Sequence, residues 1–348
     1  MKKSDRKLWP WYAVAGMDLL ILGAALCAFA LFHHVLPQEG GSAIRKIVDL
    51  DAPGPQSTEN PMEEGEAQPE SEGEGEGQEE EDAPAAATEA PPAPADPGDF
   101  SATFPDYDTG EGALFSYQSG NVRIAITGHQ EDGVTYYVAD VYVRHIRHLI
   151  SAFANGKYGK GQRQHTKDIA AACGAVFAVN GDYYGARSTG VVIRNGELFR
   201  DSVSADVCVI YANGRMETYE KRSFDLDAAV ANGAYQAWSF GPRLLEDGKA
   251  MTEFDSAVKK KNPRCAIGYY APGHYCFVVV DGRQEGYSVG MTLAELSALF
   301  ERLGCKTAYN LDGGETAVMV FDGRMVNHPA GGGRMCSDIV GIAEGGAS

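Results

Sequence analysis

The C-terminal two thirds of this chain alternates short apolar segments with polar turns, a pattern that predicts a strand-rich domain. Ten segments are rich in the β-branched and aromatic residues that strands favour. They cover residues 122–127, 135–143, 175–179, 190–194, 207–211, 266–270, 275–281, 307–311, 317–321 and 337–342. No internal repeat is evident, so we expect one folded domain over residues 111–348.

Four dipeptides favour two-residue hairpin turns, because their residues tolerate the left-handed backbone that such turns require. They are Asn195-Gly196, Asn213-Gly214, Asp247-Gly248 and Asp322-Gly323. Two-residue hairpins join antiparallel strands. The sequence therefore predicts a sheet that is antiparallel over much of its extent.

Two helices are predicted among these strands. The clearer one begins at Thr292, which forms a capping box with Glu295, and Gly304 ends it. A shorter helix covers residues 166–173, with Thr166 as its candidate cap. The fold class that follows is α+β: a mixed, largely antiparallel sheet with a few packed helices, preceded by one transmembrane helix and a disordered acidic stalk.

Near the N-terminus, an apolar run over residues 11–36 is broken only by Asp18. About 26 residues in a helix can cross a hydrocarbon core of ~30 Å. A cleaved secretory signal peptide is the alternative, but its apolar core would be only about 7–15 residues long. Basic residues precede the run, so we expect a cytoplasmic tail over residues 1–10, a single-pass anchor in the cell membrane, and an extracellular C-terminal domain.

Residues 37–110 are predicted to form a disordered stalk. Between Asp51 and Phe100 there are sixteen acidic residues and no Lys or Arg, and Pro, Gly and Ala fill the gaps. Such a segment cannot bury enough apolar surface to offset its ordering entropy. Residues 51–100 carry −16 of the chain's net charge of −18, so the net charge does not indicate the charge of a substrate. Binding of cations or basic partners by the acidic tract is an alternative, and no nucleic-acid partner is expected.

The cysteines do not indicate a metal site. Cys27 lies in the predicted anchor, and the six others show neither a CxxC pair nor the Cys/His spacing of a zinc site. An even number of external cysteines permits disulfides but specifies no pairing. These six are Cys173, Cys208, Cys265, Cys276, Cys305 and Cys336.

The segment Asn310-Leu-Asp-Gly-Gly-Glu-Thr316 carries the strongest candidate chemistry. It follows a predicted strand, and its two glycines allow a sharp turn and a close approach of the backbone to a ligand. Asp312, Glu315 and Thr316 bring two carboxylates and a hydroxyl together. Paired carboxylates suit acid–base chemistry at a glycosidic bond or the binding of a hard cation. A polar hairpin turn without function is the alternative.

A second loop, Asn180-Gly-Asp182-Tyr183, also follows an apolar strand. Asn180 and Asp182 could bind sugar hydroxyls, and Tyr183 could stack on a sugar face. An Asx turn between strands is the structural alternative.

Further candidates lie at the ends of later strands. Arg264 begins a strand, where it suits bidentate capture of a phosphate or carboxylate. Asp281 and Arg283 flank a glycine at a strand end. His328, which follows Asn327, is the histidine nearest in sequence to the Asp312 turn, and its usual pKa suits proton transfer near neutrality.

Eight motifs in this order resemble the phosphodiester glycosidase family, from about residue 136 to residue 342. They are Val179-Asn-Gly-Asp-Tyr-Tyr, Gly190-Val-Val-Ile-Arg-Asn-Gly, Phe240-Gly-Pro-Arg, Arg264-Cys-Ala-Ile-Gly, Val280-Asp-Gly-Arg, the Met291-Thr-Leu helix start, Asn310-Leu-Asp-Gly-Gly and Val326-Asn. The resemblance implies a hydrolase that cleaves the bond between an anomeric carbon and a phosphodiester, in cell-wall or exopolysaccharide material of the cell envelope. It carries family positions onto Asn180, Arg264, Asp281, Arg283, Asp312 and Asn327.

The chain departs from the family at two places. Glu315 and Thr316 stand where the family's turn often has a third glycine and a first serine, and Asp182 replaces what is often glycine. The resemblance implies that Arg264 and Arg283 hold the phosphodiester. We expect Asp312 or Glu315 to act as base or nucleophile.

The remaining roles are open at this stage. Asp182 or His328 is the candidate acid, while Tyr183 and Thr316 are candidate substrate contacts. Alternatively, Asp182, Asp312 and Glu315 share a divalent cation, Ca²⁺ or Mg²⁺, that bridges to the phosphate. Two further hypotheses are a surface module that binds glycans without cleaving them and a purely structural envelope protein.

Overall fold

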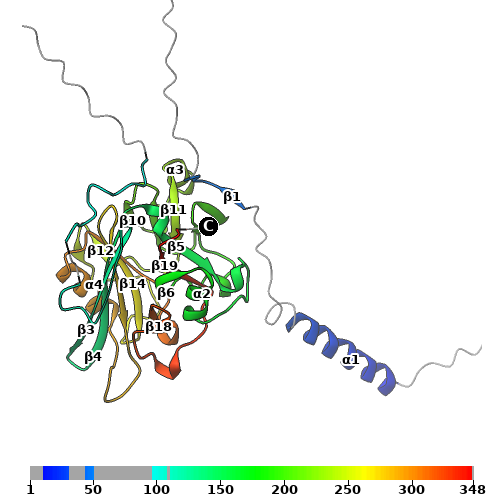
Figure 1. Cartoon of the computed structure of the whole chain (residues 1–348). Coiled ribbons are helices and arrows are strands. Elements are labelled where there is room, and N and C mark those ends of the chain that lie inside the picture. The colour runs from blue at the N-terminus through cyan, green and yellow to red at the C-terminus, as the bar shows by residue number, and fades with distance from the viewer. Residues whose placement is uncertain (1–10, 31–43, 51–95, 108–109, 347–348) are drawn as a thin grey trace, which may run out of the picture. The chain divides into compact units, whose positions relative to one another are not determined.

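The computed structural model describes residues 11–30, 44–50, 96–107 and 110–346 of the chain (Figure 1). Helix α1 (Trp11–Ala30) covers most of the predicted anchor. Over the described residues, no helix combines the length and the apolar character that a membrane crossing needs. The predicted tail and most of the predicted stalk lie outside the described residues.

The domain contains three larger antiparallel sheets and one two-stranded ribbon. In the first sheet the strand order is β1 (Arg45–Lys46), β8 (Glu197–Arg200), β7 (Val192–Arg194), β11 (Ala234–Trp238), β9 (Val207–Tyr211) and β10 (Met216–Tyr219). In the second sheet it is β16 (Thr307–Asn310), β14 (Arg264–Ala271), β15 (His274–Val280), β4 (Val134–Val143), β3 (Val122–Glu131) and β2 (Phe115–Gln118).

The third sheet has the order β18 (Arg324–Met325), β17 (Met319–Phe321), β6 (Ala175–Asn180), β19 (Asp338–Ala343) and β5 (Leu149–Phe153). The ribbon pairs β12 (Leu245–Glu246) with β13 (Lys249–Ala250). The α-helices of the domain are α2 (Thr166–Ala172), α3 (Leu226–Ala231) and α4 (Leu293–Arg302). Short 3-10 helices are η2 (Ile146–His148), η3 (Ala154–Gly156), η4 (Tyr184–Ala186), η5 (Gly314–Thr316) and η6 (Ala330–Gly332).

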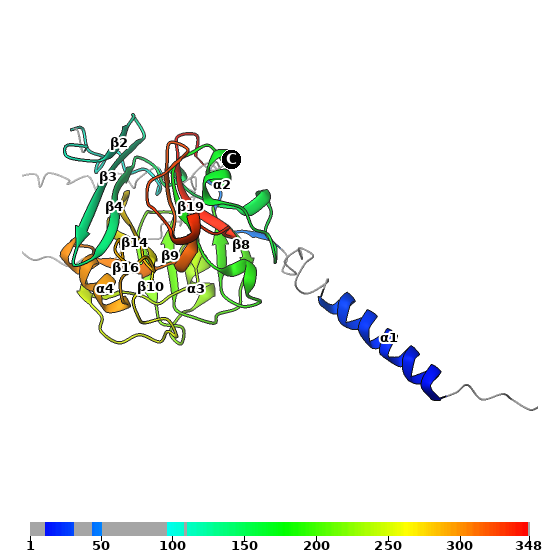
Figure 2. The ribbon, with the colours of Figure 1, turned by 90° about the horizontal axis from the view of Figure 1, so that it is seen from below.

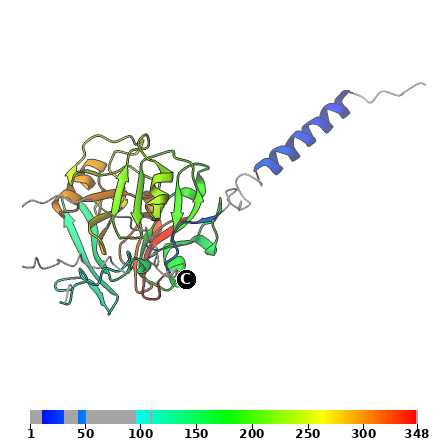
Figure 3. The ribbon, with the colours of Figure 1, turned by 90° about the horizontal axis from the view of Figure 1, so that it is seen from above.

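One hydrophobic core joins the three sheets. Its buried side chains include Phe277 from the second sheet, Phe177 from the third and Trp238 from the first. Helix α4 buries Leu296 and Phe300 in a second cluster with residues of β14, β15 and β16. The helix therefore lies against the second sheet, beside the strand that leads to the Asp312 turn (Figures 2 and 3).

The antiparallel α+β prediction is confirmed, and local signals located its turns well. The four predicted dipeptides connect β7 to β8, β9 to β10, β12 to β13, and β17 to β18. At three of these turns both residues have positive φ, as the hairpin argument requires; the pairs are Asn195-Gly196, Asp247-Gly248 and Asp322-Gly323. The predicted capping box of α4 is present, with Thr292 as N-cap.

Two predictions about boundaries need correction. His165, not Thr166, is the N-cap residue of α2, and Thr166 is its first helical residue. In addition, two parts of the predicted stalk join the folded domain. Strand β1 pairs with β8, and Phe100 is buried in the main core. These two segments contain large aliphatic and aromatic residues, such as Val48 and Phe100, which the sequence of residues 51–95 lacks.

Candidate active site

The Asn310–Thr316 turn follows β16 and packs against the start of β14. Gly314 has φ +67°, and its backbone N–H donates to the Pro263 carbonyl at 3.0 Å. A Cβ at Gly313 would lie 2.7 Å from that same carbonyl oxygen. The first glycine is therefore required by close backbone approach and the second by its conformation.

Asp312 is held by its backbone against the Asn180 loop. Its N–H donates to the Gly181 carbonyl at 3.1 Å, and the Asn180 side-chain amide donates to the Asp312 carbonyl at 2.6 Å. Asn180 also accepts the Val318 N–H at 3.2 Å, so both ends of its amide join backbone segments. The structure thus brings the two predicted loops together, with Asn180 between them.

The Asp312 carboxyl is buried, with 7% of the residue exposed. Burial raises its pKa to about 6, because the charged form loses hydration. Two neighbours oppose this rise in pKa: the Thr316 hydroxyl donates to Oδ2 at 2.7 Å, and the Arg334 guanidinium lies 4.0 Å from the same oxygen. A carboxyl that titrates near neutrality suits proton transfer at physiological pH.

Asp312 lines a pocket with a volume of about 480 Å³, which is within the range of small-molecule sites. Glu315, Arg264 and Arg283 also line it, so four of the predicted site residues share one cavity. The remaining lining residues were not predicted as site residues: Arg187, Ala205, Phe240, Gly241, Asp255, Ser256, Ala257, Val258, Asn262, Pro263, Asn310, Gly313, Gly314 and Arg334.

The two predicted arginines differ in how they are held. Arg264 is 4% exposed and donates to three backbone carbonyls, those of Met291, Val258 and Lys260. Burial, and then the charge of Arg283, lower the pKa of Arg264 to about 10, so it remains cationic at neutral pH. Arg283 is exposed and donates through Nε and Nη2 to Asn262 Oδ1.

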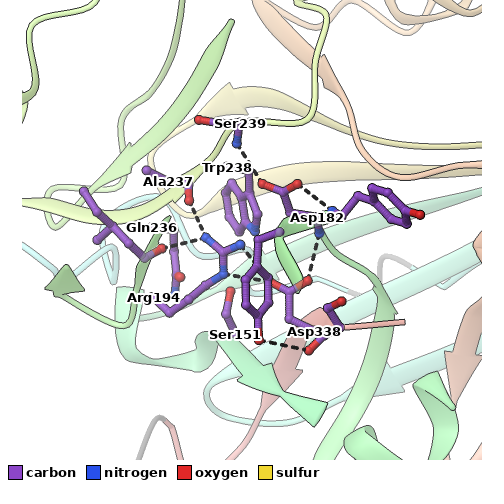
Figure 4. Close-up of polar contacts among 12 residues, drawn as sticks. Ser151, Asp182, Arg194, Gln236, Ala237, Trp238, Ser239 and Asp338 are labelled. Carbon is purple, nitrogen blue, oxygen red and sulfur yellow. Dashed lines mark hydrogen bonds and ion pairs between the residues drawn. The ribbon is translucent and has the colours of Figure 1, made fainter. Parts of the chain in front are cut away.

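Asp182, a predicted acid, lies outside the pocket lining. Its carboxylate accepts the N–H of Tyr183 at 2.5 Å and the N–H of Ser239 at 2.9 Å (Figure 4). Both carboxylate oxygens therefore accept hydrogen bonds from backbone amides. The loop and the end of β11 need these acceptors for their N–H groups. The placement gives Asp182 a structural role and removes the reason for proposing it as the acid.

Below Asp182 lies a buried ion pair between Arg194 and Asp338 (Figure 4). Arg194 donates to Asp338 Oδ2 through Nε at 2.8 Å, and Nη2 lies 2.7 Å from the same oxygen. Asp338 Oδ1 accepts the Asp182 N–H at 2.8 Å. Burial raises the pKa of the Asp338 carboxyl, and Arg194 opposes this rise. The pair fixes the loop whose Gly181 carbonyl holds Asp312.

Six further predicted residues lie outside the pocket lining: Asn180, Tyr183, Asp281, Thr316, Asn327 and His328. Asp281 is fully buried and accepts from the Asn327 amide at 2.8 Å, the Tyr287 hydroxyl at 2.9 Å and the His328 N–H at 3.0 Å. The His328 ring contacts Gln284 at 3.2 Å. Arg187 stacks over the Tyr183 ring at 5.7 Å. Asp281 and Asn327 therefore link strand ends, and His328 lies outside the pocket that Asp312 lines.

Placement also argues against the cation predicted for Asp182, Asp312 and Glu315. Over residues 11–30, 44–50, 96–107 and 110–346, no three His, Cys, Asp or Glu side chains are grouped so that they could hold a metal ion. Asp182 already uses both carboxylate oxygens on backbone amides.

Sequence reasoning missed Arg187 and Arg334. Arg187 follows the Asn180 loop by a few residues, and its Nη1 donates to the Ser239 carbonyl at 3.2 Å. Arg334 ends a glycine-rich run, and its N–H donates to the Glu315 carbonyl at 2.8 Å. Isolated arginines in loops carry no periodic signal, and Arg187 and Arg334 lie outside the motifs quoted above.

The fold and the site define the class of this protein: an antiparallel α+β domain with a buried carboxyl in an arginine-lined pocket. Residues 173–343 match the family model described as phosphodiester glycosidase. This segment is about half of the chain and contains all eight motifs quoted above. The domain belongs to the phosphodiester glycosidase family, which confirms the resemblance.

Three comparisons place the domain among known proteins. The SPbeta prophage-derived uncharacterized protein YomE of Bacillus subtilis is 31% identical over 187 residues, which are 50% of this chain and 29% of that protein. This chain therefore spans less than a third of the length of that curated relative.

The zebrafish N-acetylglucosamine-1-phosphodiester alpha-N-acetylglucosaminidase catalytic domain, auto-inhibited by its pro-peptide, has a TM-score of 0.51 and 20% identity, over 67% of this chain and 86% of that chain. A hypothetical protein from Synechocystis has a TM-score of 0.50 and 13% identity, over 66% and 64%. These two similarities show that this chain shares its fold with those structures.

Proposed function

We propose that the domain is a hydrolase that cleaves the glycosidic bond of a sugar 1-phosphodiester. The observation that carries this proposal is a buried carboxyl of raised pKa, Asp312, in a pocket with Arg264 and Arg283. The family match supports it. The similar zebrafish protein is by name a glycosidase of N-acetylglucosamine-1-phosphodiester, and we extend that substrate class to this chain.

In the proposed reaction, Arg264 and Arg283 bind the anionic phosphodiester. Asp312, as carboxylate, removes a proton from a water molecule that attacks the anomeric carbon. The bond from that carbon to the phosphate oxygen breaks, and its electron pair leaves with the phosphomonoester. The products are a free sugar and a phosphomonoester. A phosphate is a good leaving group, so protonation by a second acid is unnecessary, consistent with the positions of Asp182 and His328.

The test is turnover of N-acetylglucosamine 1-(methyl phosphate), read as released sugar. General acid–base catalysis contributes roughly 10²–10⁴-fold, so we expect Asp312→Asn to lower kcat by about 10³-fold. Glu315→Gln tests the second carboxylate of the turn and is expected to lower kcat far less, because that side chain is exposed.

A matched control is Asp322→Asn, which changes an exposed turn carboxylate of φ +48° to a residue that tolerates this conformation. It should leave kcat unchanged. Release of no sugar from any sugar 1-phosphodiester, together with saccharide binding that survives Asp312→Asn, would instead indicate a glycan-binding module.

The location of the domain outside the cell, with its N-terminal segment in the membrane, is part of the proposal. Its support is the sequence: basic residues precede an apolar run over residues 11–36, six of which lie outside the described residues. Protease treatment of intact cells that make the full chain should digest the domain. If the domain resists the protease until the cells are lysed, the proposed location is contradicted.

A further inference from the structure

Four arginines and three carboxylate residues, Asp255, Asp312 and Glu315, line the pocket. Three lining arginines, Arg187, Arg264 and Arg283, have no carboxylate within ion-pairing distance in the part of the chain that the structure describes. By contrast, the buried Arg194 is paired with Asp338. A phosphodiester carries a single negative charge. If Arg264 and Arg283 bind that charge, the Arg187 guanidinium remains for another anionic group of the substrate.

The arginines occupy different parts of the lining. Arg283 lies beside the Asp312 turn, since its guanidinium nitrogens are 3.4–3.5 Å from where a Cβ of Gly314 would be. Arg264 follows Pro263, whose carbonyl accepts the Gly314 N–H. These two arginines thus belong with the glycine turn on one side of Asp312.

Arg187 belongs to another part of the lining. Its guanidinium lies over the Phe240 ring at 5.1 Å and donates to the Ser239 carbonyl. The neighbouring Gly241 carbonyl accepts the Asn310 side-chain amide at 2.8 Å. Asn310 precedes Asp312 by two residues, whereas Gly314 follows it by two. Along this series of contacts, Asp312 lies between the Arg264–Arg283 pair and Arg187.

This order of residues indicates where each part of a bound substrate would lie in the pocket. If the phosphate binds Arg264 and Arg283, and the anomeric carbon faces Asp312, then the sugar ring extends toward Phe240 and Arg187. An aromatic ring beside a cation suits a sugar that carries negative charge: the ring covers an apolar face and the guanidinium pairs with the anion.

We propose that the substrate is an acidic sugar 1-phosphodiester, and that Arg187 binds a carboxylate or phosphate on the sugar ring. This inference rests on the proposed function, because it assumes that the phosphate binds Arg264 and Arg283. It makes Arg187 a specificity-determining residue on the side of the pocket opposite the leaving group.

The experiment compares three methyl phosphodiesters, those of glucose 1-phosphate, glucuronic acid 1-phosphate and glucose 1,6-bisphosphate esterified at position 1. We expect kcat/KM to be at least tenfold higher for one of the acidic sugars than for glucose. Arg187→Gln should reduce this ratio about tenfold, and Arg187→Lys, which keeps the charge, should restore part of it. Arg283→Gln should lower kcat/KM for all three substrates by a similar factor and keep the ratio.

Two results would overturn the inference: wild-type protein with no preference for either acidic sugar, or Arg187→Gln that lowers all three values equally. If no substrate is turned over, the proposed function fails, and calorimetric binding of glucuronic acid 1-phosphate and glucose 1-phosphate then decides. If the wild-type protein binds glucuronic acid 1-phosphate more tightly than glucose 1-phosphate and Arg187→Gln loses this difference, the result supports the role of Arg187 even though no turnover is measured. Equal affinities contradict it. Thermal unfolding of each variant checks that it is folded.

Discussion

Two glycine-containing turns with similar sequences serve different purposes in this domain. Asn310-Leu-Asp312 and Asn180-Gly-Asp182 each follow a buried strand and place an aspartate two residues after an asparagine. The two loops touch through the Asn180 amide and the Asp312 backbone. Only Asp312 lines the described pocket.

The difference lies in the hydrogen-bond donors that reach each carboxylate. Asp182 accepts two backbone N–H groups, one on each oxygen, whereas the Asp312 side chain accepts the Thr316 hydroxyl at Oδ2. Amide donors stabilise a carboxylate and occupy the lone pairs that a reaction would use. Burial with few donors instead raises the pKa of Asp312 and leaves it available for chemistry.

The largest effect on stability is expected from Asp182→Ala. This change leaves the N–H groups of Tyr183 and Ser239 without their acceptor, at about 1–3 kcal/mol for each buried donor. We expect the free energy of unfolding to fall by roughly 2–6 kcal/mol, measured by urea denaturation. A variant as stable as wild type would show that Asp182 is not structural, and the contrast between the two turns would fail.

Asp312→Asn is expected to raise the free energy of unfolding, whereas Asp182→Ala lowers it. The folded-state pKa of about 6 lies above the ordinary value of 3.8, so the folded protein holds this proton more tightly than the unfolded chain. Stability from this group is therefore fully present below pH 3.8 and is lost as pH rises through about 6. A rise of about two pKa units corresponds to about 3 kcal/mol.

Asp312→Asn removes the loss of stability that accompanies ionisation of Asp312, because asparagine does not ionise. Relative to wild type, the variant should gain up to about 3 kcal/mol in the free energy of unfolding between pH 4 and pH 7 while it loses turnover. Glu315→Gln, in the same turn but exposed, is the matched control and should show no such gain. A difference between Asp312→Asn and wild type that does not change with pH would mean that Asp312 is not protonated in the folded protein near pH 5.

The sequence predicts best those structural features that depend on contacts between residues close together in the chain. The capping box of α4 joins residues three positions apart, and the hairpin turns depend on two residues each, so local signals were sufficient. Several strands lie outside the ten predicted segments, β5 and β11 among them. Both pair with partners distant in sequence, β19 and β9, and neither is bounded by a hairpin dipeptide.

The roles of the acidic residues depend on long-range contacts. Ser239, which donates to Asp182, is 57 positions away, and the Arg194 that pairs with Asp338 is 144 positions away. No local pattern reveals which of two similar aspartates will receive such donors. The motif order brought Arg264, Arg283 and Asp312 into the prediction, and Glu315 entered it from the composition of its own turn. That hydrogen bonds already occupy the carboxylates of Asp182 and Asp281 could be seen only in three dimensions.

The smallest predicted effect concerns how Asp312 is tuned. Its ionised form must act as base in the proposed reaction, so kcat should rise with pH through about 6. The Thr316 hydroxyl donates to the Asp312 carboxylate and thereby lowers its pKa. Thr316→Val removes the donor, so the midpoint of the pH profile should move upward by roughly one to two units, since a hydrogen bond to a charged group contributes about 1.5–3 kcal/mol.

Thr316→Ser keeps the hydroxyl and should keep the midpoint, which separates loss of the donor from a change in packing at this buried position. If kcat instead falls as pH rises through 6, Asp312 acts as an acid, and Thr316→Val would then extend activity to higher pH. A profile that neither variant moves would show that Asp312 does not titrate in the rate-limiting step. The two turns would then differ in their hydrogen bonds but not in their chemistry.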